Sequence, residues 1–161
     1  MSRLFQLPLL VIFCLALNCS AASAGPAAAA NPSAKDKCPV CGMFVAKFPN
    51  WVASAKFRDG TIYSFDGPKD LFSYYLDTSR YTPGKRQADI TVLAVKEYYS
   101  LKMIDPRTAF FVTGSDVYGP MGHELTPFLS EKDATSFKVD HKGKQIIRFN
   151  AVSKQLLKTL N

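Results

Sequence analysis

The segment Cys38-Pro39-Val40-Cys41-Gly42-Met43 constrains the fold of this chain more than any other feature. It confines two thiols and one thioether to a single short turn, because Gly42 lets the backbone reverse direction tightly. Sulfur is a soft ligand, and soft sites select Cu(I). The chain has four cysteines, and the other two, Cys14 and Cys19, lie in the apolar N-terminal segment. This hexapeptide therefore holds the thiols of the folded part.

Residues 1–24 predict an export signal. A positively charged start precedes the apolar run Leu7–Leu17, which is too short to span a bilayer, and Ala22-Ser23-Ala24 fits the small-residue rule for cleavage. A lipid-modified Cys19 is the alternative N-terminus, although its lipoprotein signal is weak. Residues 25–37 are rich in Ala, Pro, Asn and Ser and predict a flexible tether. We expect the chain to lie in the periplasm or another extracytoplasmic space.

The charge pattern argues against a nucleic-acid partner. The chain carries 20 Lys and Arg against 13 Asp and Glu, a net charge of +7, but acidic residues are interspersed among the basic ones. A nucleic-acid site usually gathers its basic residues in one patch or stripe. We therefore expect no nucleic-acid binding.

Residues 38–103 predict a first unit of strand, strand, helix and strand. Two apolar runs flank Asp59-Gly60, which is a strong hairpin signal in that setting. Pro68 suits the first position of a helix, and Asp66 or Gly67 can cap that helix. The predicted elements are strands at 52–57 and 61–65, a helix from 68 with a buried stripe of Leu71, Phe72, Tyr75 and Leu76, and a strand at 90–95.

Residues 104–161 repeat this order more loosely. Ser130-Glu131-Lys132-Asp133 resembles a capping box and predicts a helix start, while residues 114–122 are rich in turn-forming Gly and Pro. The predicted elements are strands at 109–113, 124–128 and 145–149 and helices at 130–139 and 153–160. We expect an α+β fold of two small, related units packed together, with one continuous α+β domain as the alternative.

Met121-Gly122-His123 is a second candidate for metal ligation. Its Gly- and Pro-rich surroundings leave Met121 little local core to join, so an exposed soft ligand explains this methionine better than packing does. Neutral imidazole also suits copper. The complete candidate ligand set is Cys38, Cys41, Met43, Met121 and His123.

The thiol pair admits other interpretations. In an oxidising compartment it can form a structural disulfide, and at a helix N-terminus it would serve an exported thiol–disulfide oxidoreductase. A structural zinc site would need further ligands, and His123 and His141 lack the usual close spacing. The residues after Cys41 predict a turn into a strand, which is not the redox arrangement. Asp66 and Asp70 are explained by turn and cap roles, and no catalytic triad order is evident, so we expect no enzyme.

Three segments together resemble the NosL family of copper-binding accessory proteins of nitrous-oxide reductase assembly. They are Cys38–Met43, Tyr63–Gly67 leading into Leu71-Phe72, and Gly119–Phe128. They follow the family's order across about the whole exported part of the chain.

This resemblance implies a Cu(I) chaperone, usually a membrane-anchored lipoprotein, that passes copper to a metalloenzyme through a membrane assembly complex. It also implies a fold of two related α+β units. The soft ligands that it implies are Cys41, Met43, Met121 and His123, with Cys38 as an accessory or alternative ligand. The family also occurs outside denitrifying organisms, so the resemblance alone does not fix nitrous-oxide reductase as the client.

Overall fold

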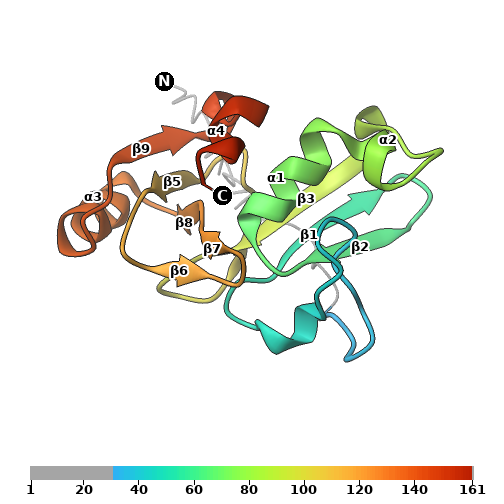
Figure 1. Cartoon of the computed structure of the whole chain (residues 1–161), viewed down its shortest axis with the longest axis horizontal. Helices are drawn as coiled ribbons and strands as arrows, with labels where there is room; N and C mark the ends of the chain where they lie inside the picture. The colour runs from blue at the N-terminus through green and yellow to red at the C-terminus, as the bar shows by residue number, and fades with distance from the viewer. Residues whose placement is uncertain (1–30, 161) are drawn as a thin grey trace, which may run out of the picture.

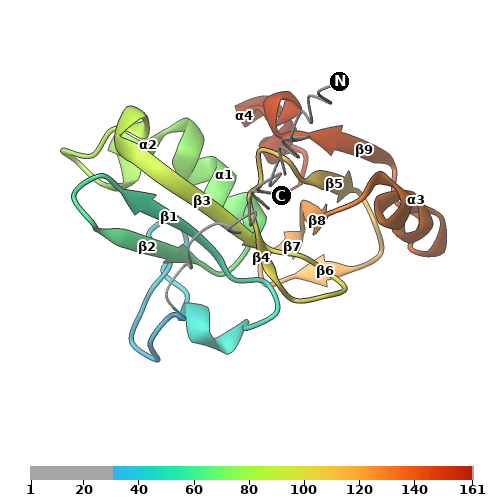
Figure 2. The same cartoon turned by 180° about the vertical axis from the view of Figure 1, so that it is seen from behind.

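The computed structural model describes residues 31–160. The predicted export signal, Cys19 and the start of the tether lie outside the described residues. Within residues 31–160, two antiparallel sheets are joined by helices that lie over and between them (Figures 1 and 2). The first sheet has the strand order β2-β1-β3-β4, and the second has the order β8-β5-β9. The predicted α+β fold is confirmed.

The elements of the first sheet and its helices are η1 (Val45–Lys47), β1 (Ala53–Phe57), β2 (Ile62–Phe65), α1 (Pro68–Leu76), α2 (Thr78–Tyr81), η2 (Gln87–Asp89), β3 (Ile90–Lys96) and β4 (Met103–Ile104). Those that follow are β5 (Phe110–Thr113), β6 (Tyr118–Gly119), β7 (Gly122–His123), β8 (Thr126–Phe128), α3 (Glu131–Asp140), β9 (Gln145–Arg148), η3 (Phe149–Ala151) and α4 (Lys154–Lys158).

Both sheets have the same internal order. The first strand of each unit is central: β1 lies between β2 and β3, and β5 lies between β8 and β9, always with antiparallel pairing. A helix, α1 or α3, connects the second strand to the third. The two sheets are therefore related in topology, as the sequence predicts. The boundary predicted between residues 103 and 104 stays a prediction, and β4, which spans it, pairs with β3.

Local sequence signals explain the start of each main helix. Pro68 is the first residue of α1, and Gly67 is its N-cap. Ser130 caps α3, since its hydroxyl accepts a hydrogen bond from the Asp133 amide at 3.1 Å. The Asp66 side chain makes no cap hydrogen bond, so Asp66 does not serve the cap role considered for it.

The predicted elements do not include the short helix α2, the two-residue strands β4, β6 and β7, or the 3-10 turns η1, η2 and η3. The one-turn helix α2 follows α1 directly, and the short hairpin β6–β7 lies within the turn-rich segment. A pair of two-residue strands is too short to leave an alternating apolar pattern, so the sequence offers no strand signal there.

Helix α1 joins the two sheets through its buried side chains. The Phe72 ring contacts those of Phe111 on β5 and Phe149 in η3, with centroid distances of 5.2 and 5.3 Å. Leu71 and Phe72 are buried as predicted, but Tyr75 is half-buried and Tyr74 is fully buried in its place. Tyr74 packs against Phe65 of the first sheet. The buried face of α1 is therefore wider than a single stripe, because both sheets press on this helix.

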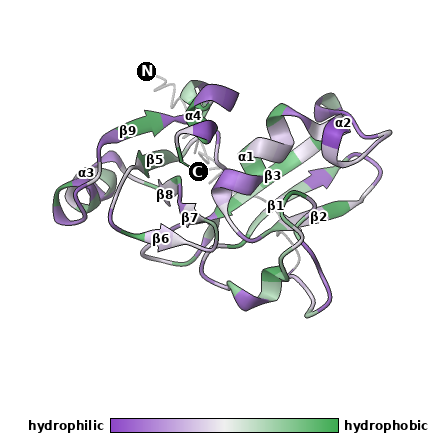
Figure 3. Ribbon diagram, in the orientation of Figure 1, coloured by the Kyte–Doolittle hydropathy of each residue, from purple (hydrophilic) through white to green (hydrophobic). Residues whose placement is uncertain are grey.

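The hydropathy of the chain follows this arrangement (Figure 3). Hydrophobic residues gather along β3 and β9, and hydrophilic residues lie on the outer turns of α2 and α4. Successive residues of β5 alternate between two cores: Phe111 enters the main core, and Val112 enters a smaller one beneath α3. Among the helices of residues 31–160, none has the length and apolar character of a membrane span.

Replacing Phe72 by alanine should lower the free energy of unfolding by about 3–5 kcal/mol, because it opens a cavity where the two sheets meet. Urea denaturation followed by circular dichroism measures this change. Val139→Ala is the control, since Val139 is 74% exposed. A loss at Phe72 no larger than that of the control would show that the two sheets do not depend on this contact.

Candidate metal centre

The hexapeptide Cys38–Met43 folds into a closed loop. The Cys38 amide donates to the Met43 carbonyl at 2.9 Å, and the Gly42 amide donates to the Cys38 carbonyl at 2.8 Å. Gly42 has a φ of +78°, a left-handed conformation that glycine adopts without steric cost. A β-bridge between Lys37 and Phe44 closes the base of the loop. The backbone thereby holds the two thiols in one small region, as the spacing predicts.

Four side chains converge at this loop. Cys38 Sγ donates a hydrogen bond to Asp70 Oδ2, and Cys41 Sγ donates one to Asp66 Oδ1, each at 3.2 Å. One ligand atom from each of these residues lies within 4.8 Å of all the others. Among the Cys, His, Asp and Glu side chains of residues 31–160, this is the one group arranged to hold a metal ion. Both cysteines are free thiols.

The two carboxylates, at and just before the start of α1, are not among the ligands predicted from the sequence. Asp66 directly follows β2, and Asp70 lies in the first turn of α1. Both carboxylates face the thiol loop, since each accepts a hydrogen bond from one of its thiols. Asp66 does not cap the helix, and Asp70 lies in its first turn. The hydrogen bonds that both carboxylates accept from the thiols are a role that their local sequence context does not indicate.

Burial controls the protonation of the centre. Cys38 is 1% exposed, Asp66 is fully buried and Cys41 is half-buried. Burial, and after it the nearby Asp70 carboxylate, raises the pKa of the Cys38 thiol. Burial likewise raises the pKa of Cys41 to about 12, with a further contribution from Asp70. The metal-free centre therefore holds both thiols protonated at neutral pH.

The two carboxylates are the hydrogen-bond acceptors of the centre. Burial raises the pKa of Asp70, against the effect of the hydrogen bonds that it receives from the two thiols. The second oxygen of Asp66, Oδ2, is buried and has no hydrogen-bond partner within the described protein. Such an atom is costly unless it binds something. The centre thus offers an unpaired oxygen beside two sulfur atoms.

The other three predicted ligands are not part of the group formed by the two thiols and two carboxylates. Met43 is half-buried in the same loop. Met121 is 43% exposed at the turn between β6 and β7, close to the start of α1, since Lys69 Nζ donates to its carbonyl at 2.7 Å. His123 stacks on Tyr118, and its Nδ1 is buried without a partner in the described protein. Ligation by these three residues stays a prediction.

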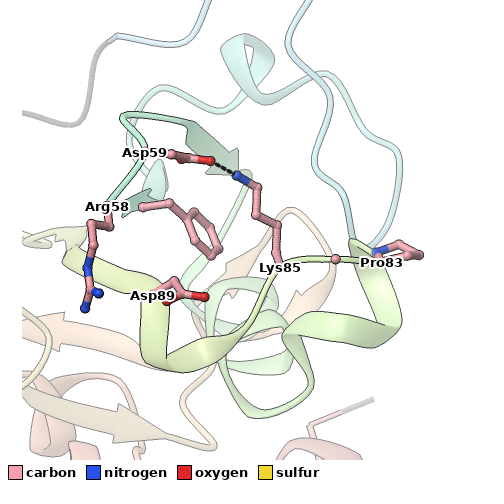
Figure 4. Close-up of a pocket in the computed structure, with 7 residues that line it drawn as sticks. Arg58, Asp59, Pro83, Lys85 and Asp89 are labelled. Atoms are coloured by element: carbon pink, nitrogen blue, oxygen red, sulfur yellow. Dashed lines mark hydrogen bonds and ion pairs between the residues drawn. The ribbon is translucent and has the colours of Figure 1, made fainter.

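A separate hollow in the described part of the chain lies away from the thiols. It measures about 490 Å³ and is bounded by the β1–β2 turn and the loop after α2 (Figure 4). The ion pair between Asp59 and Lys85 lies across one side of it. This hollow is at the opposite end of β2 from Asp66 and contains no sulfur ligand. It offers no chemistry comparable to that of the thiol centre.

A buried pair of thiols facing two carboxylates, held by a closed loop and the first turn of a helix, defines a small α+β protein with a candidate metal centre. The model of the NosL family matches residues 29–157. The chain belongs to the NosL family.

Individual relatives agree with this assignment. The chain is 27% identical over 129 residues to the copper-binding lipoprotein NosL of Stutzerimonas stutzeri, a match that covers 76% of this chain and 64% of that protein. The crystal structure of the copper chaperone NosL from Shewanella denitrificans superposes with a TM-score of 0.68 at 26% identity, covering 81% of this chain and 98% of the other.

Replacing Asp70 by asparagine should speed the alkylation of Cys41. Removal of the Asp70 charge lowers the raised pKa of this thiol, and the thiolate is the reacting species. Timed reaction with iodoacetamide at pH 8, followed by peptide mass spectrometry, measures the rate. Asp77→Asn, which removes a carboxylate paired with Lys154, is the matched control. Equal rates in all three proteins would mean that Asp70 does not influence the thiol.

Proposed function

We propose that this protein is an extracytoplasmic copper chaperone that binds Cu(I) through Cys38 and Cys41 and passes it to a copper-receiving metalloenzyme or its membrane assembly complex. Assembly of nitrous-oxide reductase is the destination that the family resemblance favours. The observation that supports the proposal most strongly is the convergence of the two thiols and two carboxylates within 4.8 Å. The names of the related copper-binding lipoprotein and copper chaperone support it as well.

Thiolate sulfur accounts for the choice of ion. Cu(I) is soft and prefers sulfur donors, whereas carboxylate oxygen suits harder ions. In the metal-free protein the carboxylates accept the thiol hydrogen bonds. When one Cu(I) takes the place of the two thiol protons, the two thiolates outweigh its single positive charge, so the carboxylates need not bind it. Met43, Met121 and His123 are the proposed additional ligands, because they are the other soft or imidazole donors next to this loop or to the start of α1.

The oxidoreductase alternative receives less support from the electrostatics. A catalytic redox cysteine has a lowered pKa, usually at a helix N-terminus. Here burial raises the pKa of both thiols, and the loop continues into the single 3-10 turn η1. A carrier needs no such activation, because ligand exchange transfers the ion without a catalytic group. We therefore propose a binding protein and not an enzyme.

The location follows from the N-terminal segment and from the relatives. The predicted export signal and the lipoprotein name of the Stutzerimonas stutzeri relative support attachment to a membrane on its extracytoplasmic side. Cys19 is the residue that would carry the lipid. Cleavage before Gly25 would instead release the protein, and mass spectrometry of the protein from membrane and soluble fractions distinguishes the two forms.

Replacing Cys41 by serine should lower the Cu(I) affinity by more than about 100-fold, because loss of a direct ligand exceeds the 10–100-fold cost of losing an outer-shell partner. Competition with a Cu(I) chelator under reducing conditions measures the affinity, and circular dichroism checks that the fold persists. Met103→Ala removes a sulfur atom from β4 and is the control. Unchanged affinity in the serine variant would refute the proposed function. Tighter binding of Zn(II) than of Cu(I) by the unaltered protein would replace copper by zinc in the proposed function, since two thiolates and two carboxylates also suit zinc.

The Cu(I) affinity should rise with pH. Each bound thiol must release its proton, and burial raises the pKa of both thiols well above neutrality. The apparent association constant should therefore increase by about tenfold per pH unit for each thiolate bound, or about 100-fold if both bind, between about pH 6 and pH 8. Chelator competition across this range, corrected for the chelator's own protonation, measures the slope. A slope of zero would show that Cu(I) binds without displacing thiol protons.

A further inference from the structure

Lys69 lies between the two carboxylates of the centre in sequence, but its side chain leads away from them. Lys69 is 3% exposed. Its Nζ donates to the Met121 carbonyl at 2.7 Å and to the Leu160 carbonyl at 3.4 Å. A buried ammonium group is costly unless its hydrogen bonds are made. Lys69 therefore ties the start of α1 to the β6–β7 turn and to the end of the chain.

Glu124 makes the reciprocal connection. It is 3% exposed and follows β7, yet its Oε2 accepts a hydrogen bond from the Lys69 amide at 2.9 Å and another from the Leu125 amide at 3.3 Å. Two glycines make room for it, because a Cβ at Gly67 or at Gly119 would collide with the Glu124 side chain. The β6–β7 segment and the start of α1 thus hold each other at two points. We call this pair of contacts the Lys69–Glu124 clasp.

The β6–β7 hairpin needs such support. It contains only the pairs Tyr118–His123 and Gly119–Gly122. A hairpin this short is not stable alone in water. At its tip Met121 remains 43% exposed, while the Nδ1 atom of His123 is buried without a partner in the described protein. The clasp therefore fixes the position of two donors that the hairpin itself cannot hold in place.

We propose that the Lys69–Glu124 clasp is a positioning device, which holds the β6–β7 turn against the start of α1, next to the carboxylates that face the thiols, so that Met121 or His123 supplies a further ligand to Cu(I) bound by Cys38 and Cys41. This inference rests on the proposed function and adds residues that do not touch the ion. Lys69 suits the role because the turn of helix that carries it also carries Asp70. One short segment thereby sets the distance between the two halves of the centre.

The decisive variant is Lys69→Met, which keeps most of the aliphatic stem and removes the ammonium donor. In the unaltered protein, X-ray absorption should show Cu(I) with two short Cu–S contacts and a third neighbour. In the variant the number of neighbours should fall by one, through loss of the contact from Met121 or His123, and the affinity should fall by about 10–100-fold, as for other outer-shell partners of metal ligands. Lys69→Arg can donate to the same carbonyls and should restore both. Lys154→Met breaks the Lys154–Asp77 ion pair on the surface and is the control for loss of a lysine.

A folded Lys69→Met variant with the coordination and affinity of the unaltered protein would overturn the clasp while leaving the proposed function intact. Two-coordinate Cu(I) in the unaltered protein would also overturn the clasp and leave the proposed function intact. Failure of the unaltered protein to bind Cu(I) would remove the proposed function and the clasp together.

A second measurement covers a Lys69→Met variant that does not fold. In the unaltered protein labelled with ¹³C at the methionine methyl groups, Cu(I) should shift the Met121 or the nearby His123 ring resonance, and Met121→Leu and His123→Gln identify the two signals. The Met103 methyl, in β4, should stay unchanged as the internal control. Absence of any shift at both Met121 and His123 would overturn the clasp.

Discussion

Helix α1 is packed between the two sheets, and the geometry of the centre depends on that contact. Tyr74 anchors the helix to the first sheet, and Phe72 anchors it to Phe111 of the second. The start of the same helix presents Asp66 and Asp70 to the thiols. A small displacement of α1 would therefore change its hydrogen bonds to the thiol loop and its hydrogen bonds to the β6–β7 turn at once. Burial of aromatic side chains along α1 thus fixes the arrangement of the polar groups at its start.

Local chemistry explains why most of the fold could be predicted. Asp59-Gly60 forms the β1–β2 hairpin, Pro68 begins α1 and Ser130 caps α3, because each of these signals acts within a few residues. The hairpin β6–β7 could not be predicted, since its strands are held by contacts with α1 and not by their own pattern. The burial of Tyr74 has a similar origin. A helix that is packed on two sides buries more residues than the single apolar stripe that its sequence predicts.

The centre could be predicted only in part for the same reason. The spacing of Cys38 and Cys41 is visible in the sequence, and so is the glycine that closes their loop. Their partners Asp66 and Asp70 lie 25 and 32 positions away, and each has a sufficient local explanation. The contacts of Lys69 span 52 to 91 positions. A single sequence carries no local sign of such pairings, so buried charged residues became recognisable as parts of one network only in the folded chain.

The unequal exposure of the two thiols gives ligand exchange a direction. Cys38 is enclosed at the base of the loop, whereas Cys41 reaches the surface. In the carrier proposed above, Cys41 is more accessible than Cys38 to the sulfur or nitrogen of an acceptor, so Cys41 is replaced before Cys38. The ion remains attached to at least one protein throughout the exchange. A carrier that transfers the ion by stepwise ligand exchange needs no conformational gate and no energy source. Stronger binding by the donor atoms of the acceptor protein is enough to complete the transfer.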